Sequence, residues 1–213
     1  MYVAPRHQPQ NQELLAELIH TNPLAAIVIH DGRGLDANHI PLLFDEDAGL
    51  LCGHVSVANE LASLNKEVDT LALFQGPQSY ISPSWCPSKL TNPEIVPTWN
   101  YAVVHVHGRL RVVHDEDWLF EHLEAMTLRQ ETSVGLSWKV SDAPPTYLNR
   151  MLKGIAGIEI RIERMTGKWK TTLMRPEENV AGVCAALRAS GTDDASEMAE
   201  LIHAWSTTNK ANE

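Results

Sequence analysis

The chain has 213 residues, of which 44% are hydrophobic and 21% charged. These values are typical of a globular domain that buries its core without disulfides or metals, and they exclude a disordered chain. The net charge of −10 argues against direct DNA binding, because DNA-binding domains usually carry a clustered basic face. The three cysteines are widely spaced and form no CxxC pair, which favours a reducing cytoplasm. The first residues lack an apolar signal core, and no apolar run approaches the ~20 residues of a membrane helix, so we expect a cytoplasmic protein.

The first half of the chain predicts short strands joined by turns. Apolar residues recur at helical spacing before Pro23, and apolar runs between turn residues follow it. Pro41 indicates an edge strand or a bulge. The expected elements are a helix over 11–20, strands over 24–30, 35–44, 50–54 and 68–74, and a helix over 58–64.

The second half predicts longer strands and several helices. A polar, proline-bearing loop over 83–97 comes first, and residues 114–117 supply a cap and an acidic first turn for a helix. Short strands without regular βα alternation favour an α+β fold with an antiparallel barrel. The expected elements are a strand over 99–113, helices over 114–129 and 144–153, a strand over 155–165, and helices over 176–188 and 193–205.

The strand over 99–113 carries an unusual aromatic face. Alternate side chains of a strand point to opposite sides, so Trp99 and Tyr101 share a face with His105 and His107. Asn100 lies on the other face with small apolar residues. Flat side chains with polar tips can hold a ring system while a few donors orient it. The alternative is a barrel wall that fills the core or a dimer interface, and the residues alone favour that alternative.

Four histidines fall on predicted strands or strand ends: His39, His54, His105 and His107. The last two stand two residues apart on one strand and could chelate a metal. No third ligand stands at a suitable spacing and HExxH is absent, so we expect no metal site. These histidines are interpreted as structural residues or as donors to an anionic ligand.

A candidate phosphate site lies where the strand over 50–54 ends and the helix over 58–64 begins. A helix N-terminus offers free N–H groups and a favourable dipole to phosphate. His54, Ser56 and Asn59 add side-chain donors there. The alternative is a serine that only caps its own helix.

Basic residues concentrate locally over 161–175, as Arg161, Arg164, Lys168, Lys170 and Arg175. This run could meet a phosphate-bearing ligand or form a solvated hairpin edge. Helix-turn-helix, GxxxxGK[ST], GxGxxG and GxSxG patterns are all absent, so nothing marks a hydrolase or a DNA-recognition helix. Cys86 lies in a loop beside proline, a setting in which a cysteine is more often unreactive.

Several strings together resemble one protein family. Residues 74–85 read FQGPQSYISPSW, residues 96–101 read VPTWNY, and residues 104–108 read VHVHG. Residues 38–42 (NHIPL) and 153–160 (KGIAGIEI) agree in order. In these strings the chain resembles the PaiB-like family, described as FMN-binding negative transcriptional regulators.

The resemblance implies an antiparallel split β-barrel of the pyridoxamine-phosphate-oxidase-like type, as a homodimer that holds FMN at the subunit interface. It implies a split-barrel FMN-binding domain over 1–175, and we expect a C-terminal helical extension over 176–213 to pack on the barrel. No catalytic residue follows from it. The candidate FMN-binding residues are His39, Gly53, His54, Ser56, Asn59, Trp99, Asn100, Tyr101 and Lys170.

The chain departs from the family pattern at three places. The stretch over 170–175 keeps Lys170 but lacks the Gln-Asn amides usual there, Cys86 replaces a tyrosine, and the loop over 89–95 is longer. Three functions stay open: a regulatory flavoprotein that senses redox state or a metabolite, an FMN-dependent oxidoreductase using NAD(P)H, and a binder of another flat ligand such as haem. Regulation is preferred by resemblance, with direct DNA binding unsupported by the charge.

Overall fold

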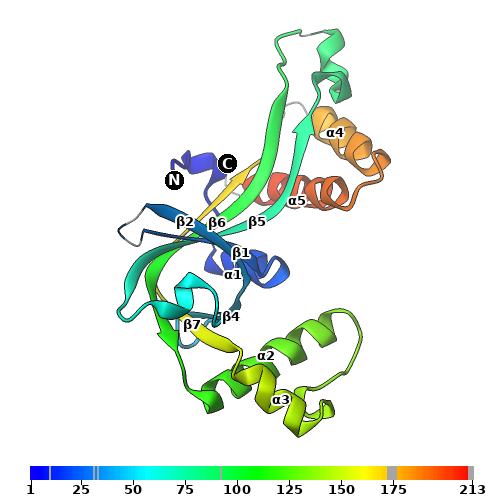
Figure 1. Cartoon of the computed structure of the whole chain (residues 1–213). Coiled ribbons are helices and arrows are strands. Elements are labelled where there is room, and N and C mark those ends of the chain that lie inside the picture. Colours follow the sequence, from blue (N-terminus) through cyan, green and yellow to red (C-terminus); the bar gives the residue numbers. More distant parts are fainter. Residues whose placement is uncertain (10, 31, 33, 92, 172–176, 211–213) are drawn as a thin grey trace. The chain divides into compact units, whose positions relative to one another are not determined.

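A computed structural model describes residues 1–9, 11–30, 32, 34–91, 93–171 and 177–210. Their strands form one sheet in the order β2-β1-β5-β6-β7-β4-β3, and all of them but β3 are labelled in Figure 1. The pairs β1–β2, β1–β5, β3–β4 and β4–β7 are antiparallel. The predicted antiparallel α+β fold is thereby confirmed. The strands are β1 (Leu24–His30), β2 (Leu35–Pro41), β3 (Leu43–Asp45), β4 (Leu50–Ser56), β5 (Val68–Ile81), β6 (Thr98–Val113) and β7 (Ile155–Lys170).

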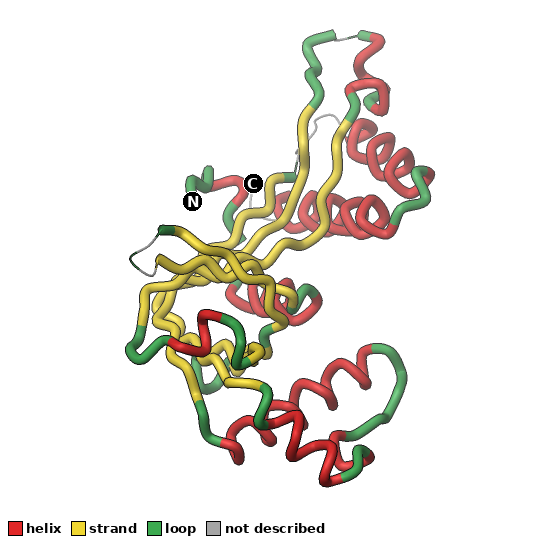
Figure 2. The backbone as a smooth tube through the Cα atoms, viewed as in Figure 1, coloured by secondary structure: helices red, strands yellow, loops and turns green. Residues whose placement is uncertain are grey.

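Each α-helix of the described residues lies at or near a predicted position. One further helix, predicted over 58–64, is not an α-helix in the structure. The α-helices are drawn as red coils in Figure 2. Helices and their bounds are α1 (Gln12–Thr21), α2 (Glu116–Ser133), α3 (Pro145–Leu152), α4 (Glu177–Ala189) and α5 (Asp193–Lys210). Short 3-10 helices lie at η1 (Pro5–His7), η2 (Glu60–Ser63), η3 (Pro83–Trp85), η4 (Pro87–Leu90) and η5 (Val140–Asp142). Across this part of the chain, no helix is long and apolar enough to span a bilayer.

The helix predicted over 58–64 is wrong. The structure has the four-residue 3-10 helix η2 there, and Asn59 caps it by accepting a hydrogen bond from the Leu61 N–H. Leu61 and Ala62 are buried, so the apolar residues that suggested an α-helix pack inward over one short turn. A turn this short lacks the aligned peptide dipoles that would attract a phosphate group.

The strand predicted over 35–44 is divided beside Pro41. Proline cannot donate to a sheet ladder, and the ladder between β1 and β2 ends at the pair Leu24–Pro41. The next N–H, from Leu42, donates to the Pro23 carbonyl at 2.9 Å. Pro41 therefore ends an edge strand of the sheet, as predicted, and the chain breaks there between β2 and β3.

The described residues form two compact units. Unit 1 consists of Met1–Leu15, Gln75–Val104 and Gly167–Glu213, and unit 2 consists of Ala16–Phe74 and His105–Thr166. Each of β5, β6 and β7 contributes residues to both. The predicted domain boundary, between residues 175 and 176, lies outside the described residues and stays a prediction.

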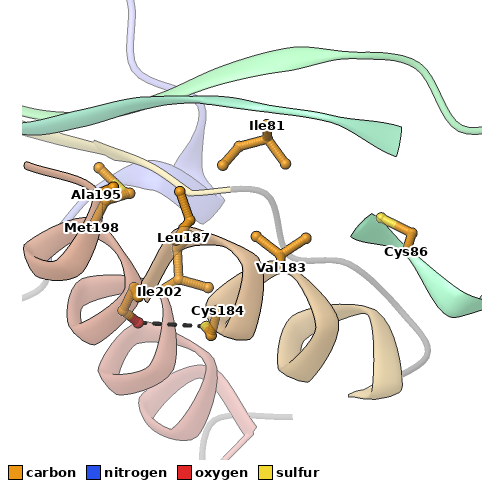
Figure 3. Packing of buried hydrophobic residues seen from close by; sticks show 9 residues of the cluster. Ile81, Cys86, Val183, Cys184, Leu187, Ala195, Met198 and Ile202 are labelled. Carbon is orange, nitrogen blue, oxygen red and sulfur yellow. Dashed lines mark hydrogen bonds between the residues drawn. The ribbon is translucent and has the colours of Figure 1, made fainter. Parts of the chain in front are cut away.

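Unit 1 has a core built between the C-terminal helices and the end of β5. Val183, Cys184 and Leu187 of α4 face Met198 and Ile202 of α5, as Figure 3 shows. The Cys184 thiol donates to the Ala199 carbonyl at 3.5 Å. Ile81 and Cys86 complete this cluster, so α4 and α5 are integral to the core of unit 1.

Unit 2 buries the inward faces of its strands. Leu51 and Val55 of β4 are buried, and in the register of the sheet they pair with Ile160 and Ala156 of β7, which are also buried. Ile158 and Ile160 are buried as predicted, but the predicted alternation is absent from burial there, because residues 156–160 of β7 are all buried.

Candidate functional site

The aromatic face of β6 is partly exposed, as its sequence alternation predicted. Asn100, Ala102, Val104 and Val106 are fully buried, whereas Trp99 is 49% exposed and Tyr101 is half-buried. The aromatic residues therefore do not fill the core of their own chain. They remain available to a ligand or to a second subunit.

Two cations gather over Tyr101 in unit 1. The Lys168 and Lys170 ammonium groups lie 5.5 and 5.8 Å from the centre of its ring. Lys168 also lies 5.9 Å from the ring of Tyr2. Ammonium groups at such distances are attracted by the aromatic quadrupole. Positive charge is thus concentrated beside a flat aromatic surface.

The two lysines are held differently. Lys170 donates to the Trp99 carbonyl at 2.6 Å and to Thr98 Oγ1 at 3.0 Å, so its ammonium ties β7 to the start of β6. Lys168 makes no hydrogen bond or ion pair within the described residues. Its charge is therefore more available to an anionic ligand than that of the predicted Lys170. The sequence interpretation placed Lys168 in the basic run over 161–175 but named only Lys170 as a candidate FMN-binding residue. Alternation along β7 placed both lysines on one face and was the signal that could have found it.

Trp99 is oriented by its neighbours in unit 1. Its indole N–H donates to Gln78 Oε1 at 3.1 Å, and Tyr80 meets it edge-on with ring centres 6.3 Å apart. Asn100, the other predicted residue on this strand, is fully buried and points away from the aromatic face. Asn100 is thereby placed in the core rather than beside Trp99 and Tyr101.

In unit 2 the residues of the predicted phosphate turn make hydrogen bonds to other groups of the protein. Asn59 donates to Asn38 Oδ1 at 2.8 Å, and Ser56 Oγ accepts from the Ala58 N–H at 3.2 Å. A Cβ at Gly53 would lie 2.7 Å from Leu42 Cδ2, so close packing within the sheet already accounts for this glycine. The His39 side chain is exposed on β2 and makes no hydrogen bond within the described residues. The Asn59 amide is therefore bonded to Asn38 on β2, whereas the Ser56 hydroxyl accepts a bond within its own turn.

His54 lies against a histidine that the sequence interpretation missed. His54 Nδ1 and His122 Nε2 are 3.3 Å apart, and Trp118 stacks on His122 with ring centres 5.2 Å apart. Burial lowers the pKa of His122 to about 4 and also lowers the pKa of His54. Both imidazoles are therefore neutral at pH 7, and one ring N–H is shared between them. The spacing of Trp118 and His122, four residues apart on α2, was the available signal.

Gly157 makes room for this aromatic stack. It pairs with His54 in the β4–β7 register, and a Cβ there would lie 2.3 Å from the Trp118 ring. We predict that Gly157→Ala lowers the free energy of unfolding by about 1–3 kcal/mol, because added volume displaces Trp118. Urea unfolding measures the change. In a Trp118→Leu background the same substitution should cost clearly less, and an equal cost in both backgrounds would refute the clash.

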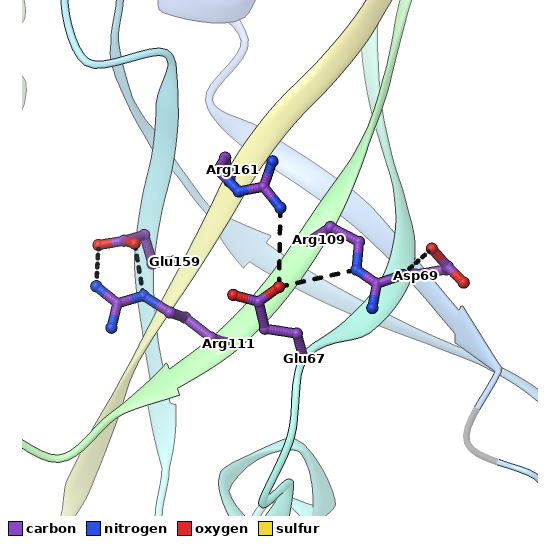
Figure 4. Close-up of polar contacts among 6 residues, drawn as sticks. All are labelled: Glu67, Asp69, Arg109, Arg111, Glu159 and Arg161. Atoms are coloured by element: carbon purple, nitrogen blue, oxygen red, sulfur yellow. Dashed lines mark hydrogen bonds and ion pairs between the residues drawn. The ribbon is translucent and has the colours of Figure 1, made fainter.

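Charged side chains on the sheet of unit 2 are paired among themselves. Arg111 binds Glu159 with two hydrogen bonds of 2.7 and 3.1 Å, and Arg109 donates to Asp69 at 2.7 Å. Glu67 lies 3.8 Å from both Arg109 and Arg161, as Figure 4 shows. These arginines are compensated by carboxylates and offer no open basic face.

The cysteines and the remaining histidines offer no reactive centre. The three cysteines form no disulfide among the described residues, Cys86 and Cys184 are buried, and burial raises the pKa of Cys52 to about 12. Burial also lowers the pKa values of His105 and His107. No three His, Cys, Asp or Glu side chains within the described part of the chain gather as metal ligands would. Of the stretch over 170–175, residues 172–175 lie outside the described residues.

The fold defines the class of protein. The known structures that resemble it include the FAD and haem binding protein of Mycobacterium smegmatis (TM-score 0.58, 16% identity, 82% of this chain and 79% of that chain). The flavocytochrome Anf3 of Azotobacter vinelandii gives a TM-score of 0.53 at 16% identity, over 80% of this chain and 73% of that chain. These similarities show a fold of the antiparallel split-barrel class.

Sequence comparison then identifies the family. The chain belongs to the family described as "Putative FMN-binding domain", whose model matches residues 1–164. It is 30% identical over 205 residues to the protease synthase and sporulation protein PAI 2 of Bacillus subtilis, covering 95% of this chain and 96% of that protein. An uncharacterised protein of Emericella nidulans is 29% identical over 241 residues, with 95% and 96% coverage. The PaiB-like resemblance is confirmed, and FMN is the cofactor of the family.

The residues of unit 1 fit FMN better than those of unit 2. FMN combines a flat ring with a phosphate, and exposed aromatic rings beside an uncommitted ammonium group match both parts. Trp99, Tyr101 and Lys168 supply these features. Asn59 instead donates to Asn38 on β2, and Ser56 Oγ accepts from the Ala58 N–H.

Proposed function

We propose that this protein is a regulatory flavoprotein that binds FMN on the aromatic face of β6 and responds to redox state or to a metabolite. The observation that carries the proposal is the pair of lysines over Tyr101, next to an exposed Trp99. Trp99 and Tyr101 would contact the flavin ring, and Lys168 would neutralise the phosphate. FMN, when bound, supplies a ring that accepts and returns electrons.

The regulatory part of the proposal rests on family and on charge. The Bacillus subtilis relative carries the name protease synthase and sporulation protein PAI 2. With a net charge of −10 and its sheet arginines paired to carboxylates, the chain lacks the broad phosphate-neutralising face of a DNA-binding domain among its described residues. We therefore favour an effect on transcription exerted through another molecule, in the cytoplasm.

We also propose a homodimer with the cofactor at its interface. An indole that is half exposed and ordered by Gln78 and Tyr80 would be covered either by flavin or by a second subunit. Aromatic side chains are enriched in the cores of such interfaces. Sedimentation of the protein with and without FMN tests this, and a monomer in both conditions would contradict it.

The deciding experiment is an absorption spectrum of purified protein before and after addition of FMN. We expect an oxidised-flavin spectrum that NAD(P)H does not bleach. Bleaching by NAD(P)H would instead support an oxidoreductase, and a haem spectrum would support the other flat ligand. A colourless protein that takes up no FMN would refute both flavin functions. A promoter fragment shifted at physiological salt would replace the indirect mechanism with direct DNA binding.

A further inference from the structure

A groove in unit 2 lies between α2 and the segment that follows it. Its volume is about 680 Å³, within the range of small-molecule sites. None of the candidate FMN-binding residues lines it. The groove therefore needs an explanation separate from the flavin.

The wall supplied by α2 follows one face of the helix. Glu121, Glu124, Leu128 and Glu131 line the groove, and their spacing of three or four residues places them on one stripe. Buried Leu119 and His122 lie on a different stripe, which packs inward. Thus α2 presents one face to the protein and another to the groove.

The opposite wall is an exposed apolar segment. Leu136 is 63% exposed and Trp138 is 50% exposed, and Leu128 on the helix is 66% exposed. The backbone N–H of Trp138 donates to Glu131 Oε2 at 3.0 Å, which holds this wall in place. Large apolar side chains exposed together on a monomer commonly mark a binding surface.

The charges around the groove select the ligand. Three carboxylates and one ammonium group, that of Lys139, belong to the lining residues, which leaves an excess of negative charge. Within the described residues, neither Glu121 nor Glu124 makes an ion pair. A cation would gain from these carboxylates and from the Trp138 ring, whereas an anion would be repelled.

We propose that this groove binds a hydrophobic organic cation, a small molecule with one ammonium group on an apolar body. The apolar part lies against Leu128, Leu136 and Trp138, and the ammonium group faces Glu121 and Glu124. A ligand in this groove would act as a metabolite signal to a regulator. The groove shares no residue with the proposed FMN site, so the two proposals are independent.

Three probes that share one apolar body and differ in charge test the proposal: 4-phenylbutylamine, 4-phenylbutan-1-ol and 4-phenylbutyrate. Calorimetry on the full chain should show saturable, submillimolar binding of one amine per chain. The alcohol should bind about fivefold to tenfold more weakly, since each of the two exposed carboxylates contributes up to about a fivefold effect, and the carboxylate probe should bind more weakly still. Equal binding of all three probes, or no saturable binding of the amine, would overturn the proposal.

Two variants locate the site. Glu121→Gln with Glu124→Gln should weaken amine binding about fivefold to tenfold and leave alcohol binding unchanged. The matched control, Glu17→Gln with Glu197→Gln, removes the same charge from exposed residues of α1 and α5 and should change nothing. Glu131 is left intact because it holds Trp138. If Trp138→Leu converts a dimer to a monomer in sedimentation, the groove is an interface between copies and the proposal fails.

Discussion

Replacing Lys168 by alanine is expected to weaken FMN binding by about 1.5–3 kcal/mol, the contribution of a hydrogen bond to a charged group. The physical reason is that its ammonium stands over Tyr101 without a hydrogen bond or ion pair within the described residues. Because the FMN-free protein loses only the cation–π contacts with Tyr2 and Tyr101, its thermal midpoint should fall by no more than a few degrees. Quenching of flavin fluorescence measures the affinity.

Riboflavin serves as the control for this prediction because it lacks the phosphate. Lys168→Ala should leave riboflavin binding unchanged, whereas Tyr101→Ala should weaken both ligands. Lys89→Ala removes the same charge elsewhere in unit 1 and should affect neither ligand. If the double variant His54→Ala with Asn59→Ala weakens FMN while Lys168→Ala does not, the phosphate lies at the turn over 53–59 instead.

The second large effect concerns acid stability. The pKa of His122 is about 4 in the folded protein, against an ordinary value of 6.5. Between these two pH values the unfolded chain binds a proton at His122 that the folded chain does not. Acidification from pH 6.5 to 4 should therefore remove up to about 3 kcal/mol of stability through this one group.

Urea unfolding of the wild type and of His122→Phe across this pH range isolates the contribution. Phenylalanine preserves an aromatic ring against Trp118 but cannot bind a proton. The free energy of unfolding of His122→Phe should thus fall less steeply than that of the wild type as the pH is lowered. The lowered pKa of His54 acts in the same direction and remains in both proteins. Parallel pH profiles would show that His122 is not a buried neutral base.

Local sequence patterns predicted most of the elements correctly. Alternation along 99–113 predicted which side chains of β6 are buried, helical spacing predicted α1, and a cap with an acidic first turn predicted α2. These properties depend on neighbours within a few positions, so a single sequence contains the necessary signal. The error at 58–64 arose because apolar spacing does not distinguish one buried 3-10 turn from an α-helix.

The candidate site was harder to predict because its decisive contacts join distant segments. His54 meets a partner 68 positions away, and Lys170 bonds a carbonyl 71 positions away. The sequence interpretation named His54 and Lys170 as candidates. It could not show that their polar atoms are hydrogen-bonded to these partners. It named Lys170, whereas the packing leaves Lys168 as the lysine without a hydrogen bond or ion pair within the described residues.

By itself, the sequence determined the family, the antiparallel α+β class and the alternating faces of the long strands. All three are written in short strings and in local periodicity, which do not depend on how the chain is packed. Only the tertiary structure decided that two lysines lie over Tyr101, that Asn59 donates to Asn38, and that α2 borders an acidic groove. These features depend on which strands and helices meet, because charge and hydrogen bonding are shared across contacts that no local pattern encodes.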